Sequence, residues 1–580
     1  MSDTLRALLE ARIARALTAA GAPDAPPVVQ PAARPEFGDY QANGVMGAAK
    51  RLGRKPREMA EAVLAAAELD DIVEHAEIAG PGFINLTLAS KVLIERVQAL
   101  PESVLAPKAP AADAPRVVVD YPSPNLAKEM HVGHLRPTVI GDALARTLAH
   151  TGHEVIRQNH VGDWGTQFGM LLAYLREAFG DADVDTLEHE IGDLEDFYRK
   201  AKERFDEDSA FADRARATVV ELQSGDEDCL AFWRRFIEVS LRHCDTLFER
   251  MNTTLSRSDV MGESAYNDDL AAVVEDLEQQ GLLTESDGAL CVFLEDFRAK
   301  DGKIAPLIVR KTDGGYLYAT TDLAAIRHRV GHLRASRALY CVDARQSLHF
   351  RQVFAVARAA GFVDDTVSLE HMPFGTVLGD DGKPFKTRSG DVVKLSDLVD
   401  EAEDRAGALV NERQPNLDAA TRASIARVVG LGAIKYADLS KSRTSDYVFS
   451  WNAMLAFEGN TAPYMQYAVS RIRSLFRRAD VDPRTLEAAP SIAAPAERAL
   501  ALLLVRLTET LEQVVATGQP HLLCAHLYDI AVGFSTFYEQ CPVLSASAPL
   551  REQRLVLAGL TEQTLTTGLG LLGIETLDRM

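Results

Sequence analysis

The most chemically suggestive stretch of the chain is D-Y-P-S-P-N-L-A-K-E-M-H-V-G-H, residues 120–134. His131 and His134 flank a glycine at the point where a β-branched run passes into a helical pattern. A helix N-terminus offers unpaired N–H groups to an anion, and imidazole donors can stabilise negative charge on a phosphorus centre. Gly133 leaves room for a flat group such as adenine, and Lys128 adds a cation. The alternative is that both histidines only cap the helix.

A second cationic segment is G-K-P-F-K-T-R-S-G, residues 382–390, which follows a predicted strand at Met372–Leu378. Its cations are Lys383, Lys386 and Arg388, and they stand among glycines and hydroxyls. A loop that grips a triphosphate tail needs these groups. Taken alone, the segment could equally be a solvated basic turn.

Both segments follow strands of one predicted sheet. Val117–Asp120 is a short β-branched run, typical of a buried parallel strand. A helix is expected from about His134 to Gly152, and Val155–Gln158 predicts the next strand. This order forms the first βαβ unit of a doubly wound parallel sheet. Further strands are predicted at Pro306–Arg310, Tyr316–Ala319 and Ala338–Val342.

The flanking segments differ in pattern from this α/β core. The N-terminal segment combines helical patterns with the strand-like Gly82–Leu88, and Ala106–Pro115 is an Ala/Pro-rich linker. The chain is mostly helical after the second cationic segment. The expected divisions are 1–105 for an α+β domain, 116–395 for a Rossmann-like α/β domain with a helical insertion at about 170–290, 396–445 for a helical connection and 446–580 for an all-α bundle.

Composition narrows the class of protein. The 580 residues are 47% hydrophobic and 25% charged, which excludes a largely disordered chain. No apolar run approaches the roughly 18 residues of a membrane span, and the N-terminus lacks a signal-peptide core. The six cysteines form no C-x-x-C pair. We therefore expect no disulfide framework, no structural zinc, no membrane contact and a cytoplasmic location.

The net charge of −22 argues against a nucleic-acid ligand, because phosphate binding favours a basic surface. The charge is uneven, however. The local basic clusters are Lys50, Arg51, Arg54, Lys55 and Arg57, and Arg471, Arg473, Arg477 and Arg478. A solvated face is the default interpretation of such clusters, and a binding stripe is the alternative.

Together, the two cationic segments resemble the H-I-G-H and K-M-S-K-S signatures of class I aminoacyl-tRNA synthetases. The form S-P-N-L-A-K-E-M-H-V-G-H is similar to the arginyl family in its bacterial form. Four further blocks extend the resemblance over essentially the whole chain: N-H-V-G-D-W-G-T-Q-F-G (159–169), M-G-E-S-A-Y-N (261–267), D-G-G-Y-L-Y-A-T-T-D (313–322) and A-F-E-G-N-T-A-P-Y-M-Q-Y-A (456–468). The second signature departs from the pattern, because it reads F-K-T-R-S, with Phe385 and Arg388 at the lysine positions.

The resemblance implies a two-step ligation driven by ATP. The carboxylate of L-arginine attacks the α-phosphate of ATP, and the terminal ribose of tRNA(Arg) then attacks the arginyl-adenylate. Mg²⁺ would accompany the pyrophosphate. ATP contacts are implied for His131, Gly133, His134, Lys383 and Lys386. The catalytic groups implied are His131, His134, Lys128, Lys386 and Arg388, although the departure in the second signature leaves its phosphate contacts undefined.

A guanidinium is planar, always charged and rich in donors, so its pocket needs carboxylates and a phenol or carbonyl. Asp322 would hold the guanidinium, with Tyr318 beside it, while Ser123 and Asn125 hold the amino-acid end. By resemblance, the arginine-binding set is Asp120, Ser123, Asn125, His134, Tyr318, Asp322 and Gln346. Taken one at a time, a capping aspartate or a core tyrosine is the commoner role.

The 446–580 segment resembles the anticodon-binding bundle of the family. Tyr464, Gln466, Tyr467 and Arg471 lie within two turns of one helix and mix rings with hydrogen-bonding groups, as unstacked bases require. Some of these aromatics belong to the core. The 1–105 segment resembles an arginyl-specific domain that touches the tRNA elbow, and a monomer is expected.

Two alternatives stay open at this point. One is an adenylate-forming nucleotidyltransferase that uses no tRNA, which would lack a long helical C-terminal domain. The other is a non-catalytic tRNA-binding paralogue, which would be expected to have lost a signature histidine.

Overall fold

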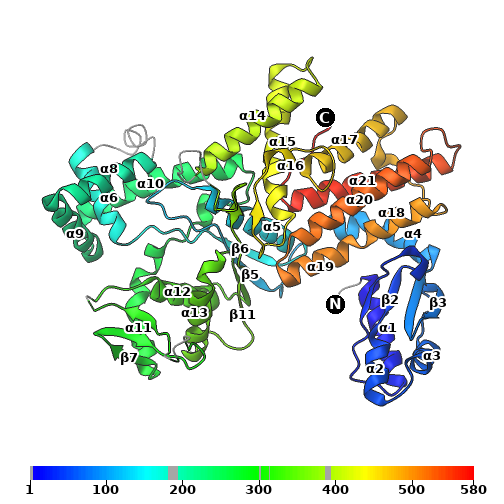
Figure 1. The fold of residues 1–580 in the computed structure, drawn as a ribbon, viewed down its shortest axis with the longest axis horizontal. Helices are drawn as coiled ribbons and strands as arrows, with labels where there is room; N and C mark the ends of the chain where they lie inside the picture. Colours follow the sequence, from blue (N-terminus) through cyan, green and yellow to red (C-terminus); the bar gives the residue numbers. More distant parts are fainter. Residues whose placement is uncertain (1–3, 181–193, 299–301, 303, 313, 386–392) are drawn as a thin grey trace.

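A computed structural model describes residues 4–180, 194–298, 302, 304–312, 314–385 and 393–580. The predicted fold class is confirmed. An α+β domain at the N-terminus, a parallel sheet with flanking helices, and a C-terminal helical bundle follow one another along the chain (Figure 1). None of the helices in the described part of the chain combines the length and the apolarity that a membrane span requires.

The N-terminal domain is built on an antiparallel sheet. Its strand order is β1 (Val29–Pro31), β2 (Tyr40–Ala42), β4 (Phe83–Leu88) and β3 (Val73–Ala79). Its helices are α1 (Leu5–Ala19), α2 (Gly44–Leu52), α3 (Pro56–Ala66) and α4 (Ser90–Gln98). The apolar residues of α1 at helical spacing, such as Leu9 and Ile13, are fully buried, and the Thr4 hydroxyl accepts a hydrogen bond from Ala7 N to cap the helix.

The central sheet is parallel, with the order β11 (Ser368–His371), β10 (Arg337–Tyr340), β5 (Arg116–Asp120) and β6 (Glu154–Gln158). Helix α5 (Leu135–His150) connects β5 to β6, and α13 (Ser347–Ala359) connects β10 to β11. The strand order reverses between β5 and β10. In open α/β sheets, ligands bind beyond the carboxyl ends of the strands at such a reversal.

Two predicted strands are wrong. Tyr316–Ala319 is not a strand, because α12 (Tyr318–Arg327) begins within it. The predicted strand at Met372–Leu378 is displaced: the sheet strand is β11, and only β12 (Val377–Leu378) is extended in that range. Both segments are short apolar runs, and runs of this length do not distinguish strand from helix or loop by their pattern.

The segment between β6 and β10 begins with a series of helices. Its helices are α6 (Thr166–Phe179), α8 (Leu194–Glu207), α9 (Ser209–Ser224), α10 (Glu227–Arg250) and α11 (Asn267–Gln279). A small antiparallel sheet follows, formed by β7 (Leu283–Ser286), β8 (Ala289–Val292) and β9 (Leu307–Arg310). The strand predicted at Pro306–Arg310 therefore belongs to this sheet and not to the parallel one.

Helices α14 (Leu395–Arg413) and α15 (Ala419–Leu439) lead from the parallel sheet to the bundle (Figure 1). A short parallel pair joins β12 to β13 (Tyr447–Val448) on the way. The remaining helices are α16 (Trp451–Met454), α17 (Ala462–Ala479), α18 (Pro495–Val505), α19 (Leu507–Thr517), α20 (His521–Gln540) and α21 (Leu550–Leu571).

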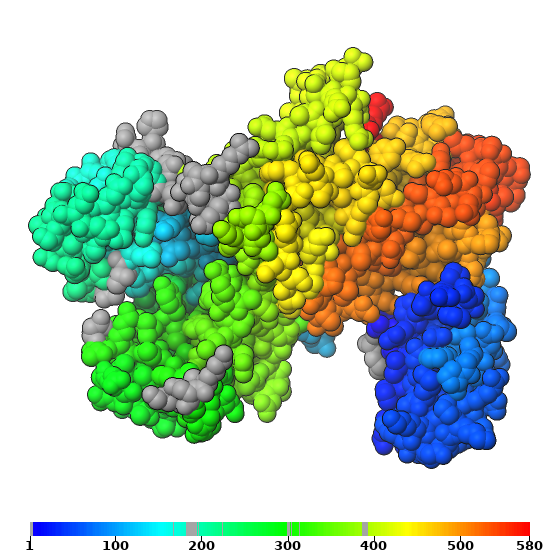
Figure 2. Space-filling model, viewed as in Figure 1, coloured from blue at the N-terminus to red at the C-terminus, as the bar shows by residue number. Residues whose placement is uncertain are grey.

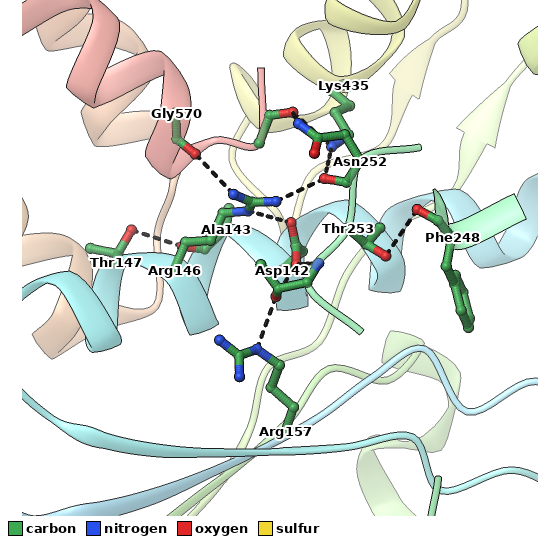
Figure 3. A network of polar contacts seen from close by, with 12 residues as sticks. Asp142, Ala143, Arg146, Thr147, Arg157, Phe248, Asn252, Thr253, Lys435 and Gly570 are labelled. Carbon is green, nitrogen blue, oxygen red and sulfur yellow. Dashed lines mark hydrogen bonds and ion pairs between the residues drawn. The ribbon is translucent and has the colours of Figure 1, made fainter. Parts of the chain in front are cut away.

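Polar contacts fix the bundle to both other parts of the molecule. The N-terminal domain docks on it through Arg498 Nη2 and Asp39 Oδ2, 2.7 Å apart, and an open gap separates this domain from the parallel-sheet domain in Figure 2. At the other end, Arg146 Nη2 and Lys435 Nζ both donate to the carbonyl of Asn252, at 2.8 and 3.1 Å (Figure 3). Lys435 Nζ also donates to Gly573 O at 2.9 Å, and Arg146 Nη1 donates to Gly570 O at 3.5 Å, which ties the C-terminal segment to α15 and α5.

Candidate functional site

A cavity of about 710 Å³ opens at the carboxyl ends of β5 and β10. This is the position at which the strand order reverses. The cavity brings together most of the residues that the sequence singled out, from segments about 200 residues apart. Those on its wall are Asp120, Ser123, Asn125, His131, Gly133, His134, Tyr318, Asp322 and Gln346.

The two signature histidines form a tight turn at the start of α5. His131 Nδ1 accepts a hydrogen bond from Gly133 N at 3.0 Å, and His134 Nδ1 accepts one from His131 N at 3.1 Å. In a neutral imidazole, an accepting Nδ1 leaves the proton on Nε2. Burial, with repulsion from His131, lowers the pKa of His134 to about 3. His134 is therefore neutral at physiological pH, with its Nε2 as a donor.

The backbone at Gly133 is packed closely against the His131 ring. A Cβ at this position would lie 2.7 Å from His131 Cε1, closer than any real side chain allows. The two imidazole centroids are 4.2 Å apart. The glycine in H-V-G-H is thus required for the His131 ring to fold back over the turn.

The first signature segment pairs with the chain that follows the second one. Val132 N donates to Val393 O at 2.9 Å, and Leu395 N donates to Met130 O at 2.9 Å. The chain just after the second signature therefore pairs with the H-V-G-H turn. Lys386 and Arg388 lie outside the described residues. Lys383 is exposed on the hairpin before them, where its carbonyl accepts from Gly379 N at 2.8 Å, and it is not among the described residues of the cavity wall.

Lys128 is also absent from the described wall of the cavity. It is exposed, and its Nζ lies 4.2 Å from the ring centroid of Tyr198 in the helical insertion. An ammonium over a ring face is a cation–π contact. In this arrangement Lys128 joins the signature segment to α8.

Asp120 reaches the cavity as one partner of a buried ion pair. Its Oδ2 accepts from Arg329 Nη2 at 2.7 Å, and its Oδ1 accepts from Ser123 Oγ at 2.7 Å. Arg329 is 1% exposed and also donates to Gln158 Oε1 at 2.6 Å. Burial by itself raises the pKa of Asp120, but Arg329, His160 and the Ser123 hydrogen bond together outweigh it and hold the pKa below its usual range. The Asp120 carboxylate is therefore ionised, and the Arg329 guanidinium already balances its charge.

A second part of the cavity wall is acidic. Asp322 Oδ2 lies 2.6 Å from His349 Nε2, and Tyr318, one turn earlier on α12, is 64% exposed. Glu263 completes this wall. Burial, followed by repulsion from Asp163 and Asp322, raises the pKa of Glu263 to about 8. Two carboxylates and a phenol on one wall can receive a planar cation with several donors.

Sequence reasoning missed Glu263, His349 and Arg329. Glu263 stands in the block M-G-E-S-A-Y-N, which points to the family but to no role for this residue. The single available signal was a lone acid between two small residues before a helix, and that pattern is also an ordinary first-turn residue. Arg329 and His349 lie on helices without any distinguishing spacing.

The residues predicted to bind tRNA lie on α17 and differ in accessibility. Tyr467 is 44% exposed, and the Arg471 guanidinium lies 4.6 Å from the ring centroid of Tyr538. Tyr464 is partly buried, with its ring centroid 5.8 Å from that of Tyr528. Gln466 is fully buried, and its Nε2 donates to the carbonyls of Val428 and Glu575 at 3.1 and 2.9 Å. Gln466 offers no accessible atom to a tRNA base, so the expected contact there is corrected to a packing role.

Three family models match consecutive parts of the chain. They are described as "tRNA synthetases class I (R), catalytic domain" for residues 97–451, "DALR anticodon binding domain" for 465–580, and "Arginyl tRNA synthetase N terminal domain" for 4–88.

Whole proteins match as well. The chain is 56% identical to an arginine–tRNA ligase of Hahella chejuensis, with 99% of this chain and 100% of that protein covered. It is 57% identical to one of a Marinomonas species, with the same coverage. Among solved structures, the arginyl-tRNA synthetases of Plasmodium falciparum and Thermus thermophilus are 27% and 28% identical, with TM-scores of 0.85 and 0.83 and complete coverage of both chains.

Proposed function

The chain belongs to the arginyl-tRNA synthetase family, and from that premise we propose how its own residues carry out the arginine–tRNA ligase reaction. The protein activates arginine with ATP and charges tRNA(Arg). Membership sets aside the two alternatives that the sequence left open, a nucleotidyltransferase without tRNA and a non-catalytic paralogue.

Adenylate formation takes place at the H-V-G-H turn. His131 and His134 donate Nε2–H bonds to the α-phosphate oxygens, and the bonds strengthen as negative charge develops. Their Nδ1 atoms are fixed by backbone N–H groups, so the rings need no reorganisation. Lys128, Lys383, Lys386 and Arg388 are the cations proposed to meet the phosphates from outside the turn.

Mg²⁺ enters with the nucleotide. In the described residues, no group of three or more His, Cys, Asp and Glu side chains is arranged to hold a metal ion. Mg²⁺ commonly binds through substrate phosphates with few protein ligands. It is therefore proposed as the companion of ATP and pyrophosphate and not as a resident cofactor.

Arginine binds between the two sides of the cavity. Asp322, Glu263 and Tyr318 receive the guanidinium, which matches their charge and their acceptors. Ser123 and Asn125 hold the amino-acid end. Asp120 orients Ser123 through the 2.7 Å hydrogen bond and does not meet the guanidinium itself. Gln346 and His134 complete the arginine contacts.

The other parts of the chain bind tRNA. We assign residues 1–105 to the tRNA elbow, 116–395 to catalysis with the insertion at about 170–290, 396–445 to the helical connection and 446–580 to the anticodon. Tyr464, Tyr467 and Arg471 are the anticodon contacts retained. A monomer in the cytoplasm is the proposed working form.

The observation that carries these assignments is that two imidazole donors and an acidic wall share one cavity. His134→Ala should reduce arginine-dependent ATP–pyrophosphate exchange, measured with tRNA present, by about 10²–10³, the cost of losing one preorganised donor. His332→Ala, at an exposed histidine beyond α12, is the matched control and should exchange normally. Equal exchange rates in His134→Ala and the wild type would remove His134 from the mechanism.

A further inference from the structure

Arg136 stands two residues after the second signature histidine and is 1% exposed. Its Nε lies 3.0 Å from Asp438 Oδ2 on α15, and the Asp438 side chain is fully buried. Its Nη1 donates to the carbonyl of Ser445 at 2.9 Å. One guanidinium thus joins the first turn of α5 to the end of α15 and to the segment that follows it.

A contribution to stability does not by itself explain why this ion pair is buried here. Taking two charges out of water costs several kcal/mol per ion, and an apolar pair of similar volume is often as stable or more stable. Burial raises the pKa of the Asp438 carboxyl above its ordinary value even though Arg136 lies beside it. A feature that costs stability calls for another reason, and the contacts beyond Ser445 supply one.

The segment held by Arg136 is paired with the strand that precedes the second signature. Tyr447 and Val448 pair in parallel with Val377 and Leu378, and the Tyr447 ring centroid lies 5.3 Å from the Arg136 guanidinium. Just outside this pairing, Thr376 N donates to Asp446 Oδ1 at 2.6 Å. The strand before the second signature is therefore joined to the segment that Arg136 contacts.

The hairpin beyond that strand is anchored on the same segment. Phe385 N donates to Val377 O at 3.0 Å, which closes the hairpin. The ring centroids of Phe385 and Phe449 are 4.6 Å apart, and those of Phe449 and Trp451 are 4.8 Å apart. Phe385 occupies the position of a lysine in the K-M-S-K-S pattern. An aromatic side chain there anchors the residue just before Lys386 to the segment that Arg136 contacts.

We propose that Arg136, through its buried pair with Asp438, is a positioning residue that holds the H-V-G-H donors and the base of the second signature in one register. The inference rests on the proposed roles of His131 and His134. The continuous path runs from α5 through Ser445 and Tyr447 to Val377 and Phe385. A purely structural ion pair could be replaced by apolar side chains without effect on the reaction, whereas a positioning pair could not.

The test replaces the pair by an apolar one, with Arg136→Met and Asp438→Leu in the same full-length chain. We expect an unchanged or higher Tm, because the buried charges are removed together. The KM for arginine should hold, since neither residue lines the cavity. The kcat of arginine-dependent ATP–pyrophosphate exchange, measured with saturating tRNA, should fall by about 10–100-fold, the scale of a displacement of about 1 Å. Wild-type kcat in this variant would overturn the proposal.

Three further variants separate the explanations. Arg554 and Glu497 form a comparable pair inside the bundle, with Nε and Oε1 2.7 Å apart and side-chain exposures of 12% and 0%. Arg554→Met with Glu497→Leu should leave kcat unchanged, and an equal loss in both double variants would overturn the proposal.

If the first double variant does not fold, Arg136→Lys keeps the charge but lacks the fork that reaches Ser445 and Asp438 together. It should lower kcat severalfold, and wild-type kcat would again contradict the inference. A normal rate in His134→Ala would instead show that the proposed role of His134, on which the inference rests, had failed.

Discussion

His131 and His134 each use their two ring nitrogens for different tasks. The Nδ1 atoms accept backbone N–H groups and cap the turn, while the Nε2 atoms carry the protons. Capping and catalysis were alternatives for these residues at the level of sequence, yet one imidazole can do both because its nitrogens point in different directions. A neutral His134 can donate but cannot supply charge, so the proposed stabilisation is a hydrogen bond.

Asp322 is the residue on which the choice of amino acid is expected to depend. Asp322→Asn keeps the shape and removes the charge that faces the guanidinium. Loss of a charged partner in a desolvated site costs about 2–5 kcal/mol, which is about 30- to several-thousand-fold in kcat/KM for arginine at 1.36 kcal/mol per decade. The uncharged isostere citrulline should lose much less. The arginine-to-citrulline ratio of kcat/KM is the measurement.

The structure removes one competing explanation for Asp322. The N-cap of α12 is Leu317, so Asp322 lies in the second turn and does not cap the helix. Its contact with His349 could still serve stability alone. A lower Tm with an unaltered arginine-to-citrulline ratio would assign Asp322 to stability and not to the pocket. ATP affinity is the internal control and should hardly change.

Glu263 predicts a pH dependence of arginine binding. Its pKa of about 8 in the empty site means that the carboxyl holds a proton at neutral pH. A bound guanidinium favours the carboxylate, so binding should release a proton and tighten with pH by up to about tenfold per unit below pH 8. Titration calorimetry in two buffers of different ionisation enthalpy measures this proton release. Glu263→Gln should abolish it and weaken binding, and the same proton release in that variant would contradict the assignment.

The linkage has a consequence for the free protein. The folded-state pKa of Glu263 lies above its ordinary value of 4.5, so the unfolded chain loses this proton first as pH rises. Glu263 therefore lowers the free energy of unfolding progressively between about pH 4.5 and 8. This trend should be absent in Glu263→Gln.

At the level of elements, α17 presents two faces. Its buried face contains Gln466, which donates to Val428 O on α15 and to Glu575 O in the C-terminal segment. Removing residues after 445 would delete α17 and expose the surface of α15 that α17 covers. Such a truncation would unfold the neighbouring helices as well as remove the anticodon contacts, so point variants on the accessible face are the sharper test.

Tyr467 on that accessible face predicts a loss of anticodon discrimination. A base that stacks on an aromatic side chain gains about 1–3 kcal/mol. Tyr467→Ala should therefore lower kcat/KM for tRNA by about 5- to 150-fold and reduce the preference among anticodon variants. Val532→Ala, at a residue that is 39% exposed on α20, is the control. If Tyr467→Ala charges anticodon variants as selectively as the wild type does, α17 is not the reader.

At the scale of the whole molecule, the bundle connects the N-terminal domain to the parallel-sheet domain. It holds the N-terminal domain through Asp39 and Arg498 and through Tyr40, whose hydroxyl donates to Glu509 Oε1 at 2.6 Å. It also contacts α5. Lys435 Nζ donates to Gly573 O just after α21. Gly573 itself lies beside Asp142 on α5, so close that a Cβ at Gly573 would be 3.2 Å from Asp142 Oδ2. The helix that starts at the H-V-G-H turn thus shares a core with the end of the chain.

This arrangement predicts that amino-acid activation depends on tRNA. The second signature lacks the first lysine of the pattern, and its base is connected to the bundle, so tRNA on the bundle can complete the site. Arginine-dependent ATP–pyrophosphate exchange should be weak without tRNA and strong with it. A tRNA whose terminal ribose has been oxidised should still support exchange, which separates ordering from charging. Strong exchange without any tRNA would contradict the idea, and tRNA binding itself should weaken with salt.

The sequence by itself determined the features that depend on local pattern. The run Val117–Asp120 and the helical spacing of α5 predicted the first strand and helix of the sheet, because side-chain periodicity encodes burial within one element. The H-x-G-H turn between them predicted a site for an anion. Tyr318 and Asp322 were expected in the arginine pocket only by resemblance to the family, and their spacing alone favoured a structural role. Runs such as Tyr316–Ala319 are too short for this periodicity to distinguish a strand from the start of a helix.

Tertiary structure alone decided which charges are open and which are neutralised. Asp120 meets Arg329 across 209 residues of chain, so its carboxylate is paired before any substrate arrives. Glu263 retains its proton because it is buried near Asp163 and Asp322, which are far from it in sequence. Gln466 is buried because it hydrogen-bonds to α15 and to the C-terminal segment. The Arg136–Asp438 pair is of the same kind. Desolvation and Coulomb interactions depend on neighbours in space, which spacing along the chain does not encode.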